Sequence, residues 1–282
     1  MSNEGSMDLT VDEIVAKAID EDLPQEDMPT DNLGLREKPG RAFLKAKEDL
    51  VLSGSELFQS TMNYLDGNVH IEWYFSDGDF VFKDQTVSTI TGNLLTIVKA
   101  ERVALNFLGQ LTGVATLTRC YVSEVEGLPT KILDTRKTTP LMRQWQKAAV
   151  RHGGGHSHRD HLSQAILIKE NHIRICGGIE QCVKRLRERT SEPIEVECGT
   201  LSEVEQAVTM KVERILLDNM NNETIREALT MISGEITTEA SGNMSLERIR
   251  SVAEMGVDFI SVGSLTHSAP CADLSLLLED EY

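Results

Sequence analysis

The chain has 282 residues and carries 28 lysines and arginines against 45 aspartates and glutamates, a net charge of −17 at pH 7. This length accommodates one large barrel-type domain, or a barrel with a smaller domain, around a core that needs no disulfides. The negative charge disfavours binding to nucleic acid or to an anionic membrane surface. The 5 cysteines form no C-x-x-C pair, and no stretch approaches roughly 18 apolar residues, so a soluble cytoplasmic protein with reduced thiols is expected.

The first third of the sequence predicts a region that mixes helices and strands. Apolar residues at 11–18 have helical spacing, and residues 23–38 are rich in turn formers. Residues 69–73 and 80–82 have the composition of strands, and the Ser-Asp-Gly between them is typical of a turn, so this segment predicts a β-hairpin. An antiparallel sheet is therefore expected in this part of the chain.

Residues 91–126 predict two helices that link this region to a second domain. Their apolar residues recur mostly at helical intervals, while Gly109 and Gly113 interrupt the pattern. Because glycine is unfavourable in a helix interior, we place the break between the two helices at these glycines.

After residue 131, short apolar runs alternate with amphipathic stretches. The runs begin at Lys131, Ala165, Pro193, Arg214, Glu235 and Asp258. Regular alternation of strand and helix is typical of a parallel sheet with right-handed crossovers. The long interval between the first two runs leaves room for one more strand near Val150, so six or seven parallel strands are expected to form an α/β barrel of the TIM type.

Polar or charged residues follow nearly every one of these runs. They are Asp134-Thr-Arg-Lys-Thr, Lys169-Glu-Asn-His, Glu197, Asp218-Asn, Glu239-Ala-Ser-Gly and Gly263-Ser-Leu-Thr-His. The carboxyl ends of the strands open onto one face of a parallel α/β barrel, where the active site lies. These separated segments are therefore expected to converge on a single pocket.

Several cationic side chains fall at or near this face. They are Arg136, Lys137, His158, Arg159 and Lys169. Unpaired buried cations are costly, so the cluster either pairs with carboxylates such as Glu170, Glu197 and Asp218 or binds an anionic ligand. So many convergent cations exceed what the stability of a barrel needs, which favours an anionic ligand.

Carboxylates and glycines at the same strand ends suggest how a phosphorylated substrate could be held. Glu197 and Asp218 end consecutive strands and offer the oxygen ligands that Mg²⁺ prefers when it also binds a diphosphate, although they could equally neutralise nearby lysines. Ser241-Gly and Gly263-Ser are similar to turns that present backbone N–H groups to a phosphate, although ordinary strand-to-helix turns have the same composition.

The segment His152-Gly-Gly-Gly-His-Ser-His-Arg has a second interpretation as a metal site, because His156 and His158 lie two residues apart. No third ligand is evident for it. The run of glycines fits better a backbone that approaches a ligand closely.

Several segments resemble, in the same order, those of the quinolinate phosphoribosyltransferase family (type II phosphoribosyltransferases). They are Glu101-Arg-Val-Ala-Leu-Asn-Phe-Leu, Lys131-Ile-Leu-Asp-Thr-Arg-Lys-Thr-Thr-Pro, Gly153-Gly-Gly-His-Ser-His-Arg, Ile168-Lys-Glu-Asn-His, Leu217-Asp-Asn-Met, Glu239-Ala-Ser-Gly and Ile260-Ser-Val-Gly-Ser-Leu-Thr-His-Ser-Ala-Pro. The resemblance covers nearly the whole chain, including the acidic Glu21-Asp-Leu-Pro segment.

The resemblance implies an N-terminal α+β open-sandwich domain over residues 1–113, completed by residues 268–282, and an incomplete α/β barrel over residues 114–267. It also implies a homodimer in which each first domain covers the mouth of the partner's barrel. The implied enzyme is a carboxylating nicotinate-nucleotide diphosphorylase that requires Mg²⁺. It transfers phosphoribosyl from phosphoribosyl pyrophosphate to quinolinate with decarboxylation, giving nicotinate mononucleotide, diphosphate and CO₂ in de novo NAD biosynthesis.

By position in these motifs, the resemblance also implies roles for individual residues. The implied quinolinate-binding residues are Arg136, His158, Arg159 and Lys169, with Arg102 reaching in from the neighbouring subunit. Lys137 would lie between the two substrates, and Glu197 and Asp218 would hold Mg²⁺ and the diphosphate. The ribose phosphate would contact Ser241, Gly242, Gly263 and His267. The implied catalytic residues are Lys137, Lys169, Glu197 and Asp218.

The sequence departs from the family pattern at a few positions. Glu170 stands where the family usually has Asp, Ser157 where it usually has Asn, and Leu141 where Gly is common. The Leu141 change bears on the shape of its loop. None of these changes removes a charged group that the chemistry needs.

Other functions are compatible with parts of this pattern. A transferase for another base, or the molybdate-operon paralogue, would share the Arg-Lys-Thr-Thr-Pro segment, but the paralogue lacks a segment like Lys169-Glu-Asn-His. A Schiff-base aldolase would use Lys169 as its nucleophile, with Arg136 and Arg159 as phosphate binders. A non-enzymatic anion-binding protein is the third alternative.

Overall fold

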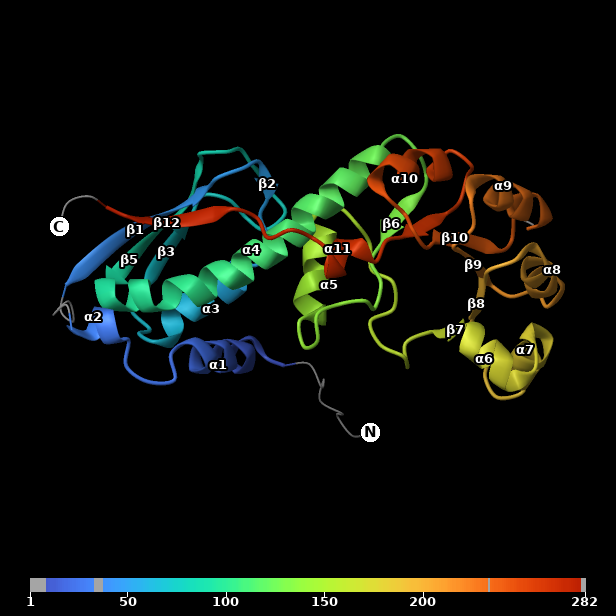
Figure 1. Cartoon of the computed structure of the whole chain (residues 1–282), viewed down its shortest axis with the longest axis horizontal. Helices are drawn as coiled ribbons and strands as arrows, with labels where there is room; N and C mark the ends of the chain where they lie inside the picture. Colours follow the sequence, from blue (N-terminus) through green and yellow to red (C-terminus); the bar gives the residue numbers. More distant parts are fainter. Residues whose placement is uncertain (1–8, 33–37, 233, 280–282) are drawn as a thin grey trace. The chain divides into compact units, whose positions relative to one another are not determined.

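The computed structural model describes residues 9–32, 38–232 and 234–279, and the chain forms two compact units. The first unit contains residues 1–119, 139–154 and 269–282, and the second contains residues 120–138 and 155–268. Each unit therefore gathers segments that are distant in the sequence. Helix α4 (Leu94–Glu124) passes from the first unit into the second (Figure 1).

The first unit contains a four-stranded antiparallel sheet. Its strand order is β12 (Leu274–Leu278), β1 (Pro39–Ala46), β5 (Thr86–Asn93) and β3 (His70–Trp73). Alternate residues of β1, namely Ala42, Leu44 and Ala46, are buried, as expected for a strand with one face on the core. Figure 1 shows β12, from the end of the chain, beside β1, where Leu278 lies opposite Ala42. The predicted antiparallel sheet is confirmed.

The hairpin predicted over residues 69–82 is wrong. Strand β3 pairs with β5, and β4 (Phe80–Val81) pairs instead with β2 (Leu50–Val51). Between them, Asp77 accepts hydrogen bonds from the backbone N–H groups of Gly54 (3.1 Å) and Ser55 (3.2 Å), at the start of α3 (Ser55–Tyr64). The turn is thus bound to the N-terminus of a helix, where N–H groups lack intrahelical partners.

The helices of this unit are α1 (Val11–Asp22), α2 (Met28–Asn32), α3, α4 and α5 (Arg143–His152). Of these, α3 and α4 supply buried residues to the core of the sheet. Phe58 of α3 and Ile97 of α4 are fully buried with Leu44 and Ile90 of the sheet. Thr10 and Glu13 form a capping box at the start of α1, so the helix predicted there is confirmed.

Helix α4 is one continuous helix of 31 residues, so the predicted break at its glycines is wrong. A Cβ atom on Gly113 would lie 1.9 Å from the carbonyl oxygen of Pro270, and one on Gly109 would lie 3.1 Å from that of Ala272. The Ala272 N–H also donates a hydrogen bond to the Gly109 carbonyl (2.9 Å). The glycines therefore let the C-terminal segment pack against the helix backbone.

The strand considered near Val150 is also wrong, because this segment is helix α5. Its residues Trp145, Ala149 and Val150 are buried at helical spacing. Within the described ranges no helix, α4 included, is long and apolar enough to cross a membrane.

The second unit is built on one sheet of six parallel strands. The order is β6 (Lys131–Leu133), β11 (Phe259–Ser261), β10 (Thr237–Ser241), β9 (Arg214–Asp218), β8 (Ile194–Cys198) and β7 (Ile166–Ile168). Strands β6 and β7 stand at the two ends of this order, so the sheet is not closed by pairing between them. The expected incomplete α/β barrel is therefore confirmed, with six strands.

The helices of this unit connect successive strands and cover the sheet. They are α6 (Glu170–Cys176), α7 (Ile179–Arg187), α8 (Leu201–Thr209), α9 (Asn222–Met231), α10 (Leu246–Ala253) and α11 (Ser264–His267). In β9, Ile215 and Leu217 are fully buried, whereas the alternating positions carry Arg214 and Asp218. Because side chains alternate along a strand, the charged residues of β9 share one face of the sheet.

Candidate active site

A cavity of about 990 Å³ opens at the carboxyl ends of the parallel strands in the second unit. Its walls include nearly every site residue expected from the sequence: Arg136, Lys137, His158, Arg159, Lys169, Glu197, Asp218, Ser241, Gly242, Gly263 and His267. Each lies in the last residues of a strand, in the segment that follows a strand, or between β6 and β7. The parallel topology is therefore what brings these residues together.

One wall of the cavity is strongly cationic. Arg136 and Lys137 follow β6, and Arg159 lies in the segment before β7. Burial lowers the pKa of Arg159, the like charge of Arg136 lowers it further, and the negative charge of Glu195 opposes both. Two guanidinium groups that repel each other at the edge of a cavity favour binding of an anion between them.

Lys169, after β7, is already paired within the site. Its Nζ lies 2.5 Å from Oε2 of Glu197, so the ion-pairing alternative holds for this lysine. Glu170 pairs instead with Arg174 on α6 (2.5 Å) and is not among the cavity-lining residues. An ammonium group in an ion pair is not the neutral amine that a Schiff-base mechanism requires.

Two carboxylates of the cavity, Glu197 in β8 and Asp218 in β9, lie close enough to influence each other. Burial raises the pKa of Asp218, and the charge of Glu197 raises it further, while Asn219, Lys169 and Lys137 act in the opposite direction. Asp218 also accepts a hydrogen bond from the side-chain amide of Asn219 (2.6 Å). A divalent cation bound by both carboxylates would relieve the repulsion between them.

Glycines shape the end of the cavity next to β10 and β11. Gly242 has a φ of +82°, and a Cβ there would lie 2.3 Å from the side-chain oxygen of Asn219, so this position requires glycine. A Cβ on Gly263 would lie 3.1 Å from Cδ of Lys137. Thr266 of α11 donates a hydrogen bond to the Lys137 carbonyl (2.8 Å), which ties the lysine segment to this helix.

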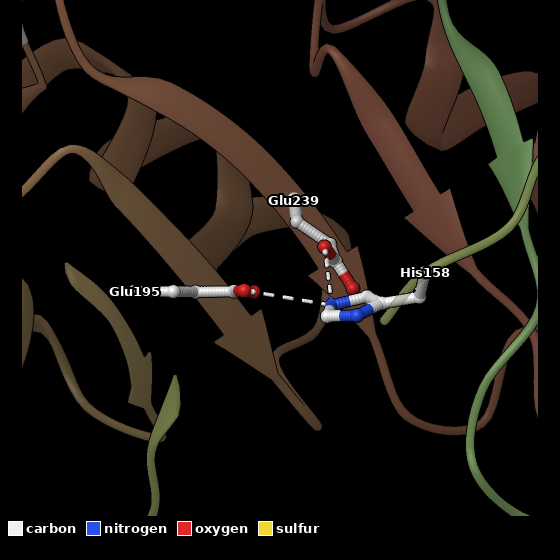
Figure 2. Close-up of side chains that lie close together, drawn as sticks. All are labelled: His158, Glu195 and Glu239. Carbon is white, nitrogen blue, oxygen red and sulfur yellow. Dashed lines mark ion pairs between the residues drawn. The ribbon is translucent and has the colours of Figure 1, made fainter. Parts of the chain in front are cut away.

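A buried charged cluster that includes two cavity-lining residues was not predicted from the sequence. Figure 2 shows the side chains of His158, Glu195 of β8 and Glu239 of β10 pointing toward one another. Nε2 of His158 lies 3.5 Å from Glu195 and 3.6 Å from Glu239. Arg214 of β9 forms ion pairs with both carboxylates. Charged residues at inward positions of otherwise apolar strands were the signal that could have found it.

Other predicted residues are not brought into the cavity. Arg102 is exposed on α4 in the first unit and is not among the described residues that line the cavity. The residues of the histidine-rich segment lie apart: Nδ1 of His152 contacts Oγ of Ser53 (2.9 Å), His156 is exposed, and His158 lies with Glu195 and Glu239. Among the described residues, no group of possible metal ligands contains both His156 and His158. Leu141 has a φ of +66°, the region that favours the glycine usual at this position.

An incomplete α/β barrel whose strand ends hold converging cations and a carboxylate pair defines an enzyme that handles a polyanionic substrate. Residues 27–112 match the model of the quinolinate phosphoribosyl transferase N-terminal domain, and residues 114–277 match that of its C-terminal domain. The chain therefore belongs to the quinolinate phosphoribosyltransferase family.

Relatives agree with this membership. A Synechocystis protein named as a probable nicotinate-nucleotide pyrophosphorylase (carboxylating) is 38% identical over 273 residues, which cover 95% of this chain and 92% of the relative. A chloroplastic nicotinate-nucleotide pyrophosphorylase (carboxylating) of Arabidopsis thaliana is 38% identical over 260 residues, covering 85% of this chain and 74% of the relative.

Solved structures show the same fold. The nicotinate-nucleotide pyrophosphorylase of Francisella tularensis superposes with a TM-score of 0.90 at 38% identity, covering 95% of this chain and 96% of that one. The enzyme of the same name from Ehrlichia chaffeensis gives a TM-score of 0.92 at 36% identity, covering 97% of this chain and all of that one (100%).

Proposed function

We propose that this chain catalyses the reaction for which its family is named. It transfers the phosphoribosyl group of phosphoribosyl pyrophosphate to quinolinate with decarboxylation, and the products are nicotinate mononucleotide, diphosphate and CO₂ in de novo NAD biosynthesis. The observation that carries this proposal is that a single cavity gathers converging cations, a carboxylate pair and two glycine turns. This arrangement suits a dianionic ring and a diphosphate ester together.

The cationic wall is the proposed quinolinate subsite. Quinolinate carries two adjacent carboxylates, which repel each other and need cations in fixed positions. The planar guanidinium groups of Arg136 and Arg159 can each meet a carboxylate with two hydrogen bonds, Lys169 supplies a third cation, and the His158 ring lies in the same subsite. The Lys169 ammonium would then move from Glu197 toward the substrate or bridge both.

The carboxyl ends of β8 to β11 form the proposed phosphoribosyl pyrophosphate subsite. Ser241, Gly242, Gly263 and His267 would surround the ribose phosphate, with backbone N–H groups as donors. Glu197 and Asp218 would hold Mg²⁺, which their mutual repulsion fits. When bound, this ion supplies charge neutralisation for the diphosphate.

Catalysis on these subsites is mainly electrostatic positioning. As diphosphate leaves, positive charge develops on the ribose and negative charge on the leaving group, next to which the Lys137 ammonium is proposed to lie. Once the pyridine nitrogen is joined to the ribose it is cationic, and its charge stabilises the electron pair that stays on the ring carbon when the neighbouring carboxylate departs as CO₂. A proton then replaces that carboxylate on the ring carbon.

The proposed active unit is a homodimer with a shared site. Arg102 is exposed on α4, in the first unit, and would complete the quinolinate subsite of the partner subunit. We also propose that the enzyme acts in the cytoplasm, by analogy with its bacterial relatives, since its plant relatives carry chloroplastic or mitochondrial names.

One assay tests the activity. The protein is incubated with phosphoribosyl pyrophosphate, Mg²⁺ and quinolinate labelled at the carboxylate next to the nitrogen, and nicotinate mononucleotide and labelled CO₂ are measured. Nicotinate serves as the matched control, because it lacks the second carboxylate and would leave cations of the subsite unpaired, so its turnover should be lower by orders of magnitude. Comparable use of both bases, or trapping of a carbonyl substrate on Lys169 by borohydride, would contradict the proposal.

A further inference from the structure

The proposed quinolinate subsite rests on buried charges that do not themselves belong to it. Glu239 is fully buried (0% exposed), and the side chain of Glu195 is 7% exposed. Glu239 lines the cavity, but Glu195 and Arg214 lie behind the cavity wall. Charged groups buried this deeply are costly and are retained when they are paired and have a task.

Arg214 fixes the two carboxylates. Its Nη2 forms an ion pair with Glu239, and its Nε lies 3.6 Å from Oε1 of Glu195. Its guanidinium also stacks over the ring of Phe259, 4.4 Å from the centroid. These contacts come from β8, β9, β10 and β11, so the carboxylates are held by the rigid sheet. The spacing of His158, Glu195 and Glu239 is similar to that of a set of metal ligands. However, Arg214 already supplies the positive charge that pairs with the two carboxylates.

His158, in contrast, lies in a segment outside the regular strands and needs to be oriented. Its Nε2 points at Glu195 and Glu239 (Figure 2), and its Nδ1 accepts a hydrogen bond from the Arg159 N–H (2.7 Å). Its own N–H donates to Oδ1 of buried Asp134 (2.9 Å). An acceptor role at Nδ1 places the proton of the neutral ring on Nε2, facing the carboxylates.

A continuous set of contacts therefore runs from Arg214 through Glu239 to His158 and on to the backbone of Arg159. We infer that Glu239, fixed by Arg214, orients the His158 ring and thereby the Arg159 segment, so that Glu239 and Arg214 are positioning residues for quinolinate. This inference rests on the proposed function. A side chain in the first layer of a site binds well only when a second layer holds its rotamer.

A double-mutant cycle tests the inference. Quinolinate affinity of the full-length enzyme is measured by calorimetry for wild type, Glu239→Gln, His158→Ala and the double variant. Glu239→Gln should raise the Kd for quinolinate roughly tenfold to a hundredfold, the range seen when outer-layer partners of bound groups are removed. If Glu239 acts through His158, it should add little further loss in the His158→Ala background. The Kd for phosphoribosyl pyrophosphate should stay within about twofold.

A matched control separates this role from general stability. Asp31→Asn breaks a partly buried ion pair of the first unit, in which Lys99 Nζ lies 2.6 Å from Asp31, and it should lower the unfolding temperature without changing quinolinate affinity. If Glu239→Gln does not fold, the combined change of Arg214, Glu195 and Glu239 to glutamine replaces it, because neither the guanidinium nor a carboxylate of the cluster then remains buried without its partner.

The imidazole nitrogen resonances of His158 in the free enzyme give an independent readout. We expect a protonated Nε2 and an unprotonated Nδ1 in wild type, and loss of this single tautomer in Glu239→Gln. Additive losses in the cycle, tighter quinolinate binding by Glu239→Gln, or an unchanged His158 spectrum would overturn the inference. Failure of wild type to bind quinolinate, with the His158 spectrum as expected, would instead contradict the proposed function.

Discussion

At the scale of single residues, the cavity holds cations and carboxylates together, and Lys137 is one of the cations that influence Asp218. Its positive charge lowers the pKa of Asp218, and a Cβ on Gly263 would lie 3.1 Å from its Cδ. A cation in this position can stabilise negative charge that develops in a transition state.

Replacing Lys137 by alanine should therefore lower kcat roughly a hundredfold or more, the usual loss for one charged contact to a transition state. Steady-state kinetics with both substrates at saturation would measure it. Lys131→Ala, at an exposed position on the first residue of β6, is the matched control and should leave kcat unchanged. If only the Michaelis constants of Lys137→Ala changed, Lys137 would be a binding residue and no more.

Asp218 illustrates a conflict between stability and function. Burial and the charge of Glu197 raise its pKa, so the folded protein holds this proton more tightly than the unfolded chain does. Stability is then highest below the unfolded pKa and falls as pH rises through the folded pKa. The ionised Asp218 carboxylate thus destabilises the metal-free fold at neutral pH. A cation bound to this carboxylate would offset that loss of stability.

We predict that Asp218→Asn raises the unfolding temperature of the metal-free protein at pH 7 and that this gain disappears at acidic pH. The same variant should need far more Mg²⁺ for activity while retaining quinolinate binding. Glu13→Gln is a control of opposite sign, because the backbone N–H and hydroxyl of Thr10 lower the pKa of Glu13. Its contribution is present at neutral pH and is lost as pH falls. Lower stability of Asp218→Asn at pH 7 would contradict the prediction.

At the scale of elements, α4 shows how a tertiary contact overrides a local preference. An exposed Gly→Ala change inside a helix normally stabilises by about 1 kcal/mol. At Gly113 the added carbon would meet the Pro270 carbonyl at 1.9 Å, and at Gly109 the Ala272 carbonyl at 3.1 Å. These contacts should make Gly→Ala destabilising at both positions, because the backbone of α4 and of the C-terminal segment cannot move apart without losing other contacts.

Gly113→Ala should lower the free energy of unfolding by about 2 kcal/mol or more, as expected for overpacking of this severity. Gly109→Ala should have a smaller effect. Gly67→Ala, at a position with no atom within 4 Å of the added carbon, should be nearly neutral. Denaturant unfolding of the three variants measures this order, and a stabilised Gly113→Ala would show that the C-terminal segment does not pack here.

The sequence predicted the positions of helices and strands better than it predicted which elements and side chains contact one another. The alternating runs after residue 131 predicted the strands of the barrel and the polar residues at their ends, because strand ends in a parallel barrel share one face. The sequence could not predict that β3 pairs with β5 and β4 with β2. The turn between them is held by Asp77, which binds the start of α3 in a distant part of the chain. The roles of Glu195 and Arg214 were hidden for a similar reason, since their partners lie on other strands.

At the scale of the whole molecule, the proposed homodimer makes a quantitative prediction. If Arg102 completes the partner's site and Lys169 its own, Arg102→Ala and Lys169→Ala chains should each be inactive yet rescue each other. After joint unfolding and refolding in equal amounts, about half of the dimers are mixed and one of the two sites in each is intact. Roughly a quarter of wild-type activity should return, provided that subunits pair without bias.

Differential affinity tags supply the control for this experiment. Mixed dimers isolated through both tags should contain all of the recovered activity, and each variant refolded alone should contain none. Mixed dimers without activity would place Arg102 outside the partner's site.

The pairing of β12 with β1 has a consequence for synthesis. Strand β12 (Leu274–Leu278) leaves the ribosome well after the other strands of its sheet, which lie within residues 39–93. Every residue of the second unit, up to 268, emerges before β12 does. Until β12 emerges, β1 presents an unpaired edge, which is a template for association with other chains. A chain that stalls before residue 274 would thus be able to fold its barrel and still be prone to aggregate.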